Sequence, residues 1–145
     1  MLYLSLYFKT HRDAYYNLLQ RVRTEGAWEA WLHFFLSGII DTTEQATRTA
    51  QRILELFEND RARVEKLGRA ASSALRLHHS FQKRVIFSIP GAAKRLRLSQ
   101  PTVTAAIAHL AKLRIVREMT GRRRSKLYAY DAYLKILSEG AEPIK

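Results

Sequence analysis

The chain has 145 residues and a formal net charge of +12 at pH 7, from 25 Lys and Arg against 13 Asp and Glu. Hydrophobic residues make up 47% of it, which is enough to bury the core of one ordinary domain or of two small ones. It contains no cysteine, which excludes disulfides and cysteine-bound zinc.

The positive charge is concentrated in the C-terminal half of the chain. Residues 1–73 hold 10 Lys and Arg and 9 Asp and Glu, a net charge of +1, whereas residues 74–145 hold 15 and 4, a net charge of +11. A solvated surface needs charge, but it does not need charge of one sign on one half. The asymmetry therefore favours a polyanionic partner, either nucleic acid or anionic lipid.

No targeting or membrane segment is predicted. Lys9, His11 and Arg12 interrupt the apolar stretch after Met1, and no small-residue cleavage site follows. The longest apolar run, at residues 31–40, contains His33 and is far shorter than the roughly 20 residues of a membrane span. We expect a soluble cytoplasmic protein without a membrane partner.

The N-terminal half is predicted to be helical. Residues 2–9 suit a short helix, and residues 12–23 carry an apolar stripe at helical spacing that ends before Gly26. Residues 27–40 are apolar nearly all round, which predicts a helix at the centre of a bundle. Thr42 to Gln45 has the pattern of a capping box, so we expect a separate helix to start there and to run to about Leu67.

The segment Gly-Arg-Ala-Ala-Ser-Ser at residues 68–73 is small and polar, and we place a domain boundary there, with domains at residues 1–69 and 70–145. A helix is expected at residues 74–82. It contains His78 and His79, but adjacent helical residues point about 100° apart and cannot jointly bind one metal ion. No metal site and no cofactor are predicted.

Two helices joined by a tight turn are predicted after a brief strand at residues 85–87. Ser88 is an N-cap candidate, with Pro90 in the first helical turn. Small alanines on this first helix allow a close approach of the second, which Ser99 caps and which runs from Gln100 to about Arg114. The exposed side of the second helix begins with small polar residues, as a helix that enters the major groove requires. A plain helical hairpin with a polar exterior is the alternative.

A basic β-hairpin follows the two helices. Residues 115–119 alternate in polarity, Thr120-Gly121 turns the chain, and residues 127–130 return as a strand. Between them, residues 122–126 hold four cations in five positions, which repel each other in the absence of an anionic partner. Beside a docked helix the same cations can contact the phosphate backbone or the minor groove.

The expected fold is therefore mainly α: a helical bundle fragment followed by a winged helix-turn-helix domain with a small β-hairpin wing. A last short helix is expected at residues 131–137. The expected partner is DNA. The predicted DNA-binding residues are Lys94, Arg95, Arg97, Ser99, Gln100, Thr102, Thr104, Arg122, Arg123, Arg124 and Lys126.

Two stretches of the chain, one near each end, resemble the C-terminal part of bacterial Fic family proteins. They are LYLSLYFKTHRDAYYNLLQRVRTEGAWEAWLHFFLSGI and LSQPTVTAAIAHLAKLRIVREMTGRRRSKLYAYDAYLKILSEG, separated by a long predicted helix. The resemblance implies the end of a helical Fic domain followed by a winged helix. Members of the family typically transfer AMP from ATP to a protein hydroxyl, through a loop of pattern HPFxxGNGR.

That loop is absent from the chain, because none of its five histidines begins such a motif. No catalytic residue can be carried over, and we expect the chain itself not to be an enzyme. In the family the loop lies just upstream of the point where this sequence starts, so the chain is similar to a Fic protein cut after its catalytic loop.

Three functions are weighed from the sequence. The first is a DNA-binding winged-helix protein, a transcriptional regulator. The second is a fragment of a Fic AMP-transferase in which the winged helix is a regulatory module, and the third is a protein-interaction module. A helical half deprived of upstream helices would expose apolar faces, so we also expect a homodimer through residues 1–67.

Overall fold

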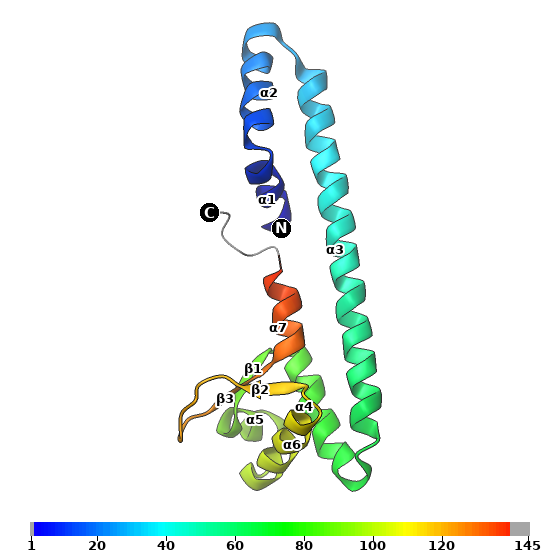
Figure 1. Cartoon of the computed structure of the whole chain (residues 1–145), viewed down its shortest axis with the longest axis vertical. Coiled ribbons are helices and arrows are strands. Elements are labelled where there is room, and N and C mark those ends of the chain that lie inside the picture. The colour runs from blue at the N-terminus through cyan, green and yellow to red at the C-terminus, as the bar shows by residue number, and fades with distance from the viewer. Residues whose placement is uncertain (1, 140–145) are drawn as a thin grey trace. The chain divides into compact units, whose positions relative to one another are not determined.

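The computed structural model describes residues 2–139, which form seven α-helices, a short 3-10 helix and a three-stranded antiparallel sheet (Figure 1). The fold is mainly α, as the sequence predicts. Packing divides the described residues into two compact units, one formed by the residues up to Gln51 with Glu139, the other by Arg52–Ser138. The division falls within helix α3 (Trp28–Glu65), upstream of the boundary predicted at residues 68–73.

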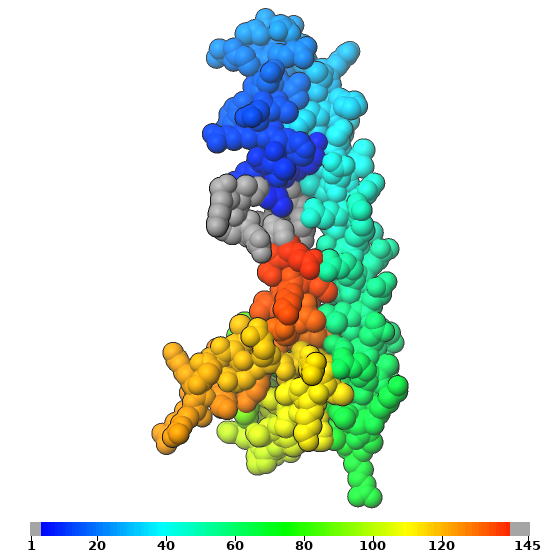
Figure 2. Space-filling view, in the orientation of Figure 1, coloured from blue at the N-terminus to red at the C-terminus, as the bar shows by residue number. Residues whose placement is uncertain are grey.

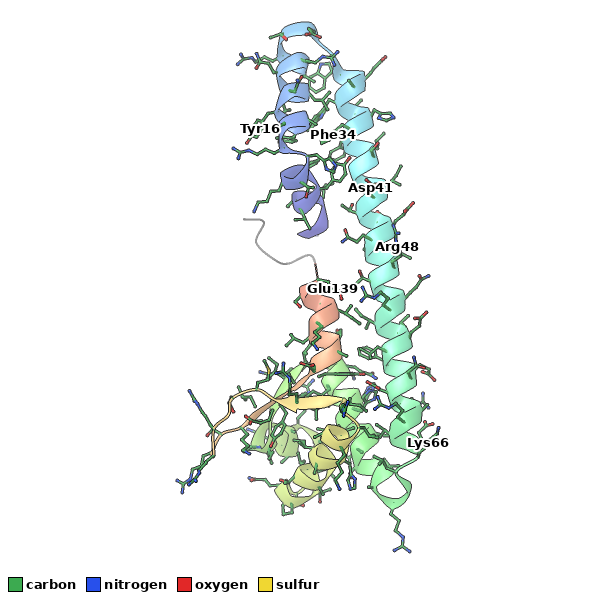
Figure 3. The ribbon with its side chains drawn as sticks, viewed as in Figure 1. Tyr16, Phe34, Asp41, Arg48, Lys66 and Glu139 are labelled. Carbon is green, nitrogen blue, oxygen red and sulfur yellow. The ribbon has the colours of Figure 1, made fainter. Side chains whose placement is uncertain are left out.

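The first unit contains α1 (Leu2–Thr10), α2 (Arg12–Glu25) and the N-terminal part of α3. Both short helices were predicted, and Gly26 ends α2 in the left-handed conformation with φ 67°. Aromatic rings hold the helices together. Phe8 of α1 lies 6.0 Å from Phe34 and 6.5 Å from Trp31 between ring centroids, and Figure 3 shows Phe34 on the side of α3 that faces α1 and α2.

Gly38 of α3 lies directly against α1. A Cβ atom at this position would lie 2.7 Å from two ring carbons of Tyr7 and 3.4 Å from a methyl carbon of Leu4. Real Cβ atoms do not approach a ring this closely, so the tyrosine ring occupies the space that any side chain at residue 38 would need.

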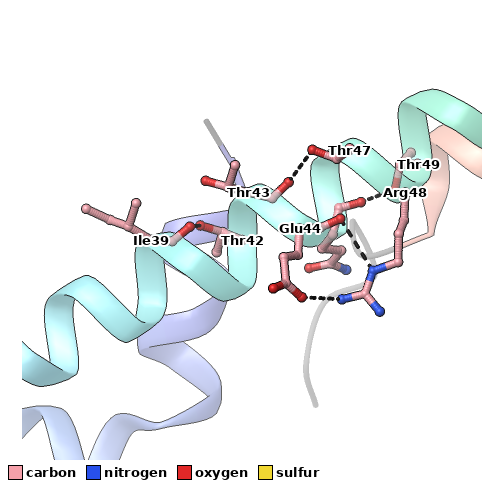
Figure 4. Close-up of polar contacts among 8 residues, drawn as sticks. Ile39, Thr42, Thr43, Glu44, Thr47, Arg48 and Thr49 are labelled. Atoms are coloured by element: carbon pink, nitrogen blue, oxygen red, sulfur yellow. Dashed lines mark hydrogen bonds and ion pairs between the residues drawn. The ribbon is translucent and has the colours of Figure 1, made fainter.

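The capping box predicted at Thr42 is wrong, because α3 runs without interruption from Trp28 to Glu65. The Thr42 hydroxyl donates to the Gly38 carbonyl at 2.7 Å. Figure 4 shows its second contact, with the Ile39 carbonyl at 3.1 Å, and the hydrogen bond from Thr47 to the Thr43 carbonyl at 2.9 Å. Threonine hydroxyls can bond the carbonyl four residues back, and here they turn inward on their own helix instead of capping a new one. Glu44 pairs with Arg48 at 3.1 Å, one turn further along.

The prediction that residues 27–40 lie at the centre of a bundle is also wrong for the described residues. Trp31, Phe34 and Phe35 are half-buried against α1 and α2, but a second group of large apolar side chains on α3 faces solvent. Its members are Trp28, Leu32, Leu36, Ile39 and Ile40, with exposed fractions of 38% to 59%.

The second unit continues from the last turns of α3 through a 3-10 turn (Gly68–Ala70) into α4 (Ala71–Lys83). The elements that follow are β1 (Ile86–Ser88), α5 (Ile89–Leu96), α6 (Gln100–Lys112), β2 (Val116–Glu118), β3 (Leu127–Tyr130) and α7 (Asp131–Ser138). The strands lie in the order β1-β3-β2, all antiparallel, with Phe87 opposite Tyr128 and Arg117 opposite Ala129.

The core of the second unit lies between α4, α5, α6 and the sheet. Its fully buried side chains include Leu77 and Phe81 of α4, Val103 and Leu110 of α6, and Tyr130 of β3. The helix predicted at residues 131–137 forms as α7, in which Ile136 is buried and Leu137 is 42% exposed. Among the described residues, no helix combines the length and the apolarity needed to cross a membrane.

Candidate nucleic-acid interface

The turn between α5 and α6 is built from local signals that the sequence carries. The Ser88 hydroxyl accepts from the Gly91 N–H at 3.2 Å and caps α5, as predicted. Arg97 ends α5 in the left-handed conformation with φ 51°, and Leu98 follows, half-buried against the core. The buried Ala92 and Ala93 let α5 pack closely on α6, and this packing fixes where the N-terminus of α6 points.

The first turn of α6 presents fewer free polar groups than predicted. The Ser99 hydroxyl caps the helix by accepting from the Thr102 N–H at 3.2 Å, and it also lies 2.7 Å from the Thr102 hydroxyl, which is half-buried. Thr104 is exposed, but its hydroxyl donates to the Gln100 carbonyl at 2.8 Å. The Gln100 side chain on this turn is exposed and makes no hydrogen bond with a described residue, so its donors and its acceptor remain free.

The hairpin between β2 and β3 extends away from the body of the second unit (Figure 2). Glu118 holds its base: one carboxylate oxygen accepts from the Thr120 N–H at 2.7 Å, the Gly121 N–H at 2.9 Å and the Thr120 hydroxyl. These hydrogen bonds, with that of the Thr120 hydroxyl the strongest, lower the pKa of Glu118. The carboxylate near the basic tip thus serves to fix the turn, and Gly121 takes a positive φ of 62°.

The cations of the hairpin tip are exposed, and its three arginines have no partner among the described residues. Arg122, Arg123 and Arg124 make no hydrogen bond or ion pair with any described residue, and Lys126 is equally exposed. The side chains extend from the end of the hairpin into solvent (Figure 3). Three unpaired arginines and the exposed Lys126, whose charge helps to lower the pKa of Glu118, form a surface on one protruding loop that attracts anions.

Not every cation near the sheet is free in this way. Arg117 of β2 donates to Asp131 through its Nε atom at 3.0 Å and one Nη atom at 2.7 Å, and Lys135 pairs with the other oxygen of Asp131 at 3.0 Å. The hydrogen bond from Arg117, followed by that from Lys135, lowers the pKa of Asp131. This cluster neutralises itself in part and braces α7 against β2, so its cations are less available to an anion than those of the hairpin tip.

Lys94 and Arg95 line a groove together with Arg84, which was not among the predicted DNA-binding residues. The groove, about 940 Å³ in volume, lies between β1 and α5. The guanidinium carbons of Arg84 and Arg95 lie 5.9 Å and 5.8 Å from the centroid of the Phe87 ring. The sequence signal for Arg84 was its position one residue before the strand predicted at residues 85–87.

A buried polar network links α3, α4 and β3 in the second unit. The Tyr130 hydroxyl donates to one Asp60 oxygen at 2.8 Å, the other Asp60 oxygen pairs with Arg63, and Arg63 also donates to the Leu113 carbonyl at the end of α6. The His78 Nε2 atom lies 3.3 Å from the Tyr130 hydroxyl. The sequence predicts Tyr130 in a strand and His78 on a helix, but nothing in it indicates a link between them.

The hydrogen-bond directions in this network follow from the count of protons. Tyr130 has one hydroxyl proton, and giving it to Asp60 leaves its oxygen as the acceptor for an Nε2–H of His78. Burial raises the pKa of Tyr130 far above its usual value, and the hydrogen bond to Asp60 adds to the effect. Burial also lowers the pKa of His78, against an opposing effect of Asp60. His78 is therefore neutral at physiological pH.

The lowered pKa of His78 predicts a loss of stability in mild acid. Below about pH 6.5 the unfolded chain binds a proton at this histidine that the folded chain resists, so the free energy of unfolding falls as the pH falls. Urea unfolding of the wild type and His78→Gln between pH 7.5 and 5 is expected to show a steeper decline in the wild type. His33→Gln, at an exposed position in the first unit, is the control and should keep the wild-type slope, because His33 is not among the groups that lower the pKa of His78. An equal slope in His78→Gln would contradict the assignment.

A search against models of protein families finds none that matches the chain.

Proposed function

We propose that the chain binds double-stranded DNA through its second unit, with α5 and α6 acting as a helix-turn-helix and the β2–β3 hairpin as a wing. The observation that carries the proposal is the hairpin tip: four exposed cations, three of them arginines without any partner in the described residues, on a loop whose base is fixed by Glu118. A loop of this kind suits a phosphate backbone, which supplies negative charge at regular spacing.

Contacts to the backbone should dominate over contacts to bases. Arg and Lys side chains on α5, in the β1–α5 groove and on the hairpin can reach phosphates, which hold a protein in place without reading sequence. On α6, Thr102 and Thr104 already use their hydroxyls within the helix, which leaves Gln100 as the main candidate for base recognition. We therefore propose high affinity with modest sequence preference.

Salt dependence tests the proposal. Fluorescence anisotropy with a labelled duplex of mixed sequence, between 50 and 300 mM NaCl, should give a linear plot of log affinity against log salt. With four to seven phosphate contacts the slope should be roughly −3.5 to −6. A slope near zero, or no binding at 50 mM NaCl, would reject the proposal; binding lost while self-association is retained would favour a protein-interaction module.

The resemblance to Fic proteins leads to a narrower proposal. In this interpretation the second unit is a nucleic-acid-binding or regulatory module that accompanies a helical Fic segment, and the chain contributes no catalytic residue. A transcriptional role follows from DNA binding, and a dimer through residues 1–67 would present two copies of α6 to a site with two-fold symmetry.

A further inference from the structure

The exposed face of α3 in the first unit has two unlike halves. Its N-terminal half carries large apolar side chains, with Leu32 51%, Leu36 55% and Ile39 38% exposed. Its C-terminal half carries small ones, among them Thr43, Ala46 and Ala50, all exposed. At about 100° per residue, these six positions fall within an arc of about 80°, so they form one continuous strip along the helix.

The small half borders a groove. A hollow of about 620 Å³ lies between α1 and α3 and is lined on the α3 side by Thr42, Thr43, Ala46, Thr47 and Ala50. The Thr42 and Thr47 hydroxyls already donate to carbonyls of their own helix (Figure 4), so covering them would leave neither donor without an acceptor. The hollow can therefore receive an apolar side chain.

We propose that this strip binds the same strip of a second copy of the chain, with the two α3 helices antiparallel. A two-fold axis near residue 41 places Leu36 on Ala46 of the partner, Leu32 on its Ala50 and Ile39 on its Thr43, and each contact occurs twice. Large side chains then meet small ones along a strip of about 27 Å. In an interface of this isologous kind, a patch must complement itself.

Size and charge both select the antiparallel arrangement. A parallel pair would set Leu36 against Leu36 and Ala46 against Ala46, which crowds one end and leaves a gap at the other. Asp41, the residue nearest the axis, lies on the opposite side of the helix from the strip, so the two copies of this carboxylate do not face each other. Glu44, beside the strip, is already paired with Arg48 in its own chain.

Disulfide trapping tests the orientation, since the natural chain has no cysteine. Leu36→Cys mixed with Ala46→Cys should form a cross-linked dimer under mild oxidation, and neither variant should cross-link alone. In the antiparallel pair, two copies of residue 36 are separated by about 15 Å along the helices, too far for a disulfide. Cross-linking of Leu36→Cys with itself would show a parallel pair and overturn the proposal.

A size exchange tests the contact between Leu36 and Ala46. Sedimentation of the full chain without DNA should show a wild-type dimer at micromolar concentration. Leu36→Ala and Ala46→Leu should each weaken the dimer at least tenfold, and the double variant should return to within about threefold of the wild type because the large and small partners are only exchanged. Circular dichroism checks that each variant stays folded.

A wild type that remains monomeric at 100 µM, or a double variant weaker than both single variants, would overturn the proposal. The first result would point to another protein as the occupant of the strip. Neither measurement involves nucleic acid, so a failure here leaves the proposed DNA binding untouched, and failure of DNA binding leaves this interface untouched.

Discussion

Replacement of Arg122, Arg123 and Arg124 by alanine is expected to weaken DNA binding by roughly 100-fold or more at 0.1 M salt. Each phosphate contact contributes a slope of about −0.9 to the plot of log affinity against log salt, which is close to a factor of eight at this salt concentration. Three lost contacts would also make the slope shallower by up to about 2.7. Anisotropy titrations of both proteins over a salt series give both quantities.

The folded state should not change in this variant, because the three side chains are exposed and have no partner among the described residues. A matched control replaces Lys9, Arg12 and Arg23 by alanine, which removes three positive charges from exposed positions in the first unit that form no ion pair with a described residue. If net charge alone drove binding, the two variants would lose affinity equally. A loss confined to the hairpin variant supports the site, and equal losses would reject it.

The second large effect is expected from Tyr130→Phe, which should lower the free energy of unfolding by about 1–3 kcal/mol. The change leaves one oxygen of the buried Asp60 carboxylate without its hydrogen-bond donor, and a buried charged group without a partner is costly. Urea unfolding monitored by circular dichroism measures the difference. Tyr128→Phe on the same strand is the control, since its hydroxyl has no hydrogen bond within the described residues and should cost less than about 0.5 kcal/mol.

A double-mutant cycle with Asp60→Ala separates the hydrogen bond from general loss of packing. If the two groups interact as the 2.8 Å distance indicates, the double variant should be less destabilised than the sum of the single variants, by about 1 kcal/mol or more. If the two substitutions have strictly additive effects on the free energy of unfolding, Tyr130 and Asp60 stabilise the unit independently. That result would contradict the hydrogen-bonded network.

The elements of the second unit were predictable because their signals are local. Ser88 and Ser99 cap the helices expected of them, and residues 127–130 form β3 as predicted. The helix-turn-helix and wing functions remain proposals, because they depend on a partner and not on local geometry. The basic residues of the hairpin could be predicted from the sequence because four of them stand within five positions, at residues 122–126.

The features that sequence reasoning missed depend on contacts between distant residues. Asp60 and Tyr130 are 70 positions apart, and nothing in the pattern around either residue indicates the other. The false capping box at Thr42 shows a second limit: threonine can cap a new helix or bond back to its own, and only the surrounding structure decides. The burial of residues 27–40 on α3 was predicted wrongly for a related reason. When apolar residues lie all round a helix, the sequence does not indicate which side is buried.

The close contact at Gly38 restricts how the sequence can vary in the first unit. On the exposed strip a residue can change in size with little effect on the packing of α1 and α2 against α3. At position 38, however, the ring of Tyr7 lies where a methyl group would be. A substitution there requires the Tyr7 ring to move or a smaller residue at position 7. We therefore expect changes at position 38 to be accompanied by changes at position 7 among natural variants, whatever partner the strip binds.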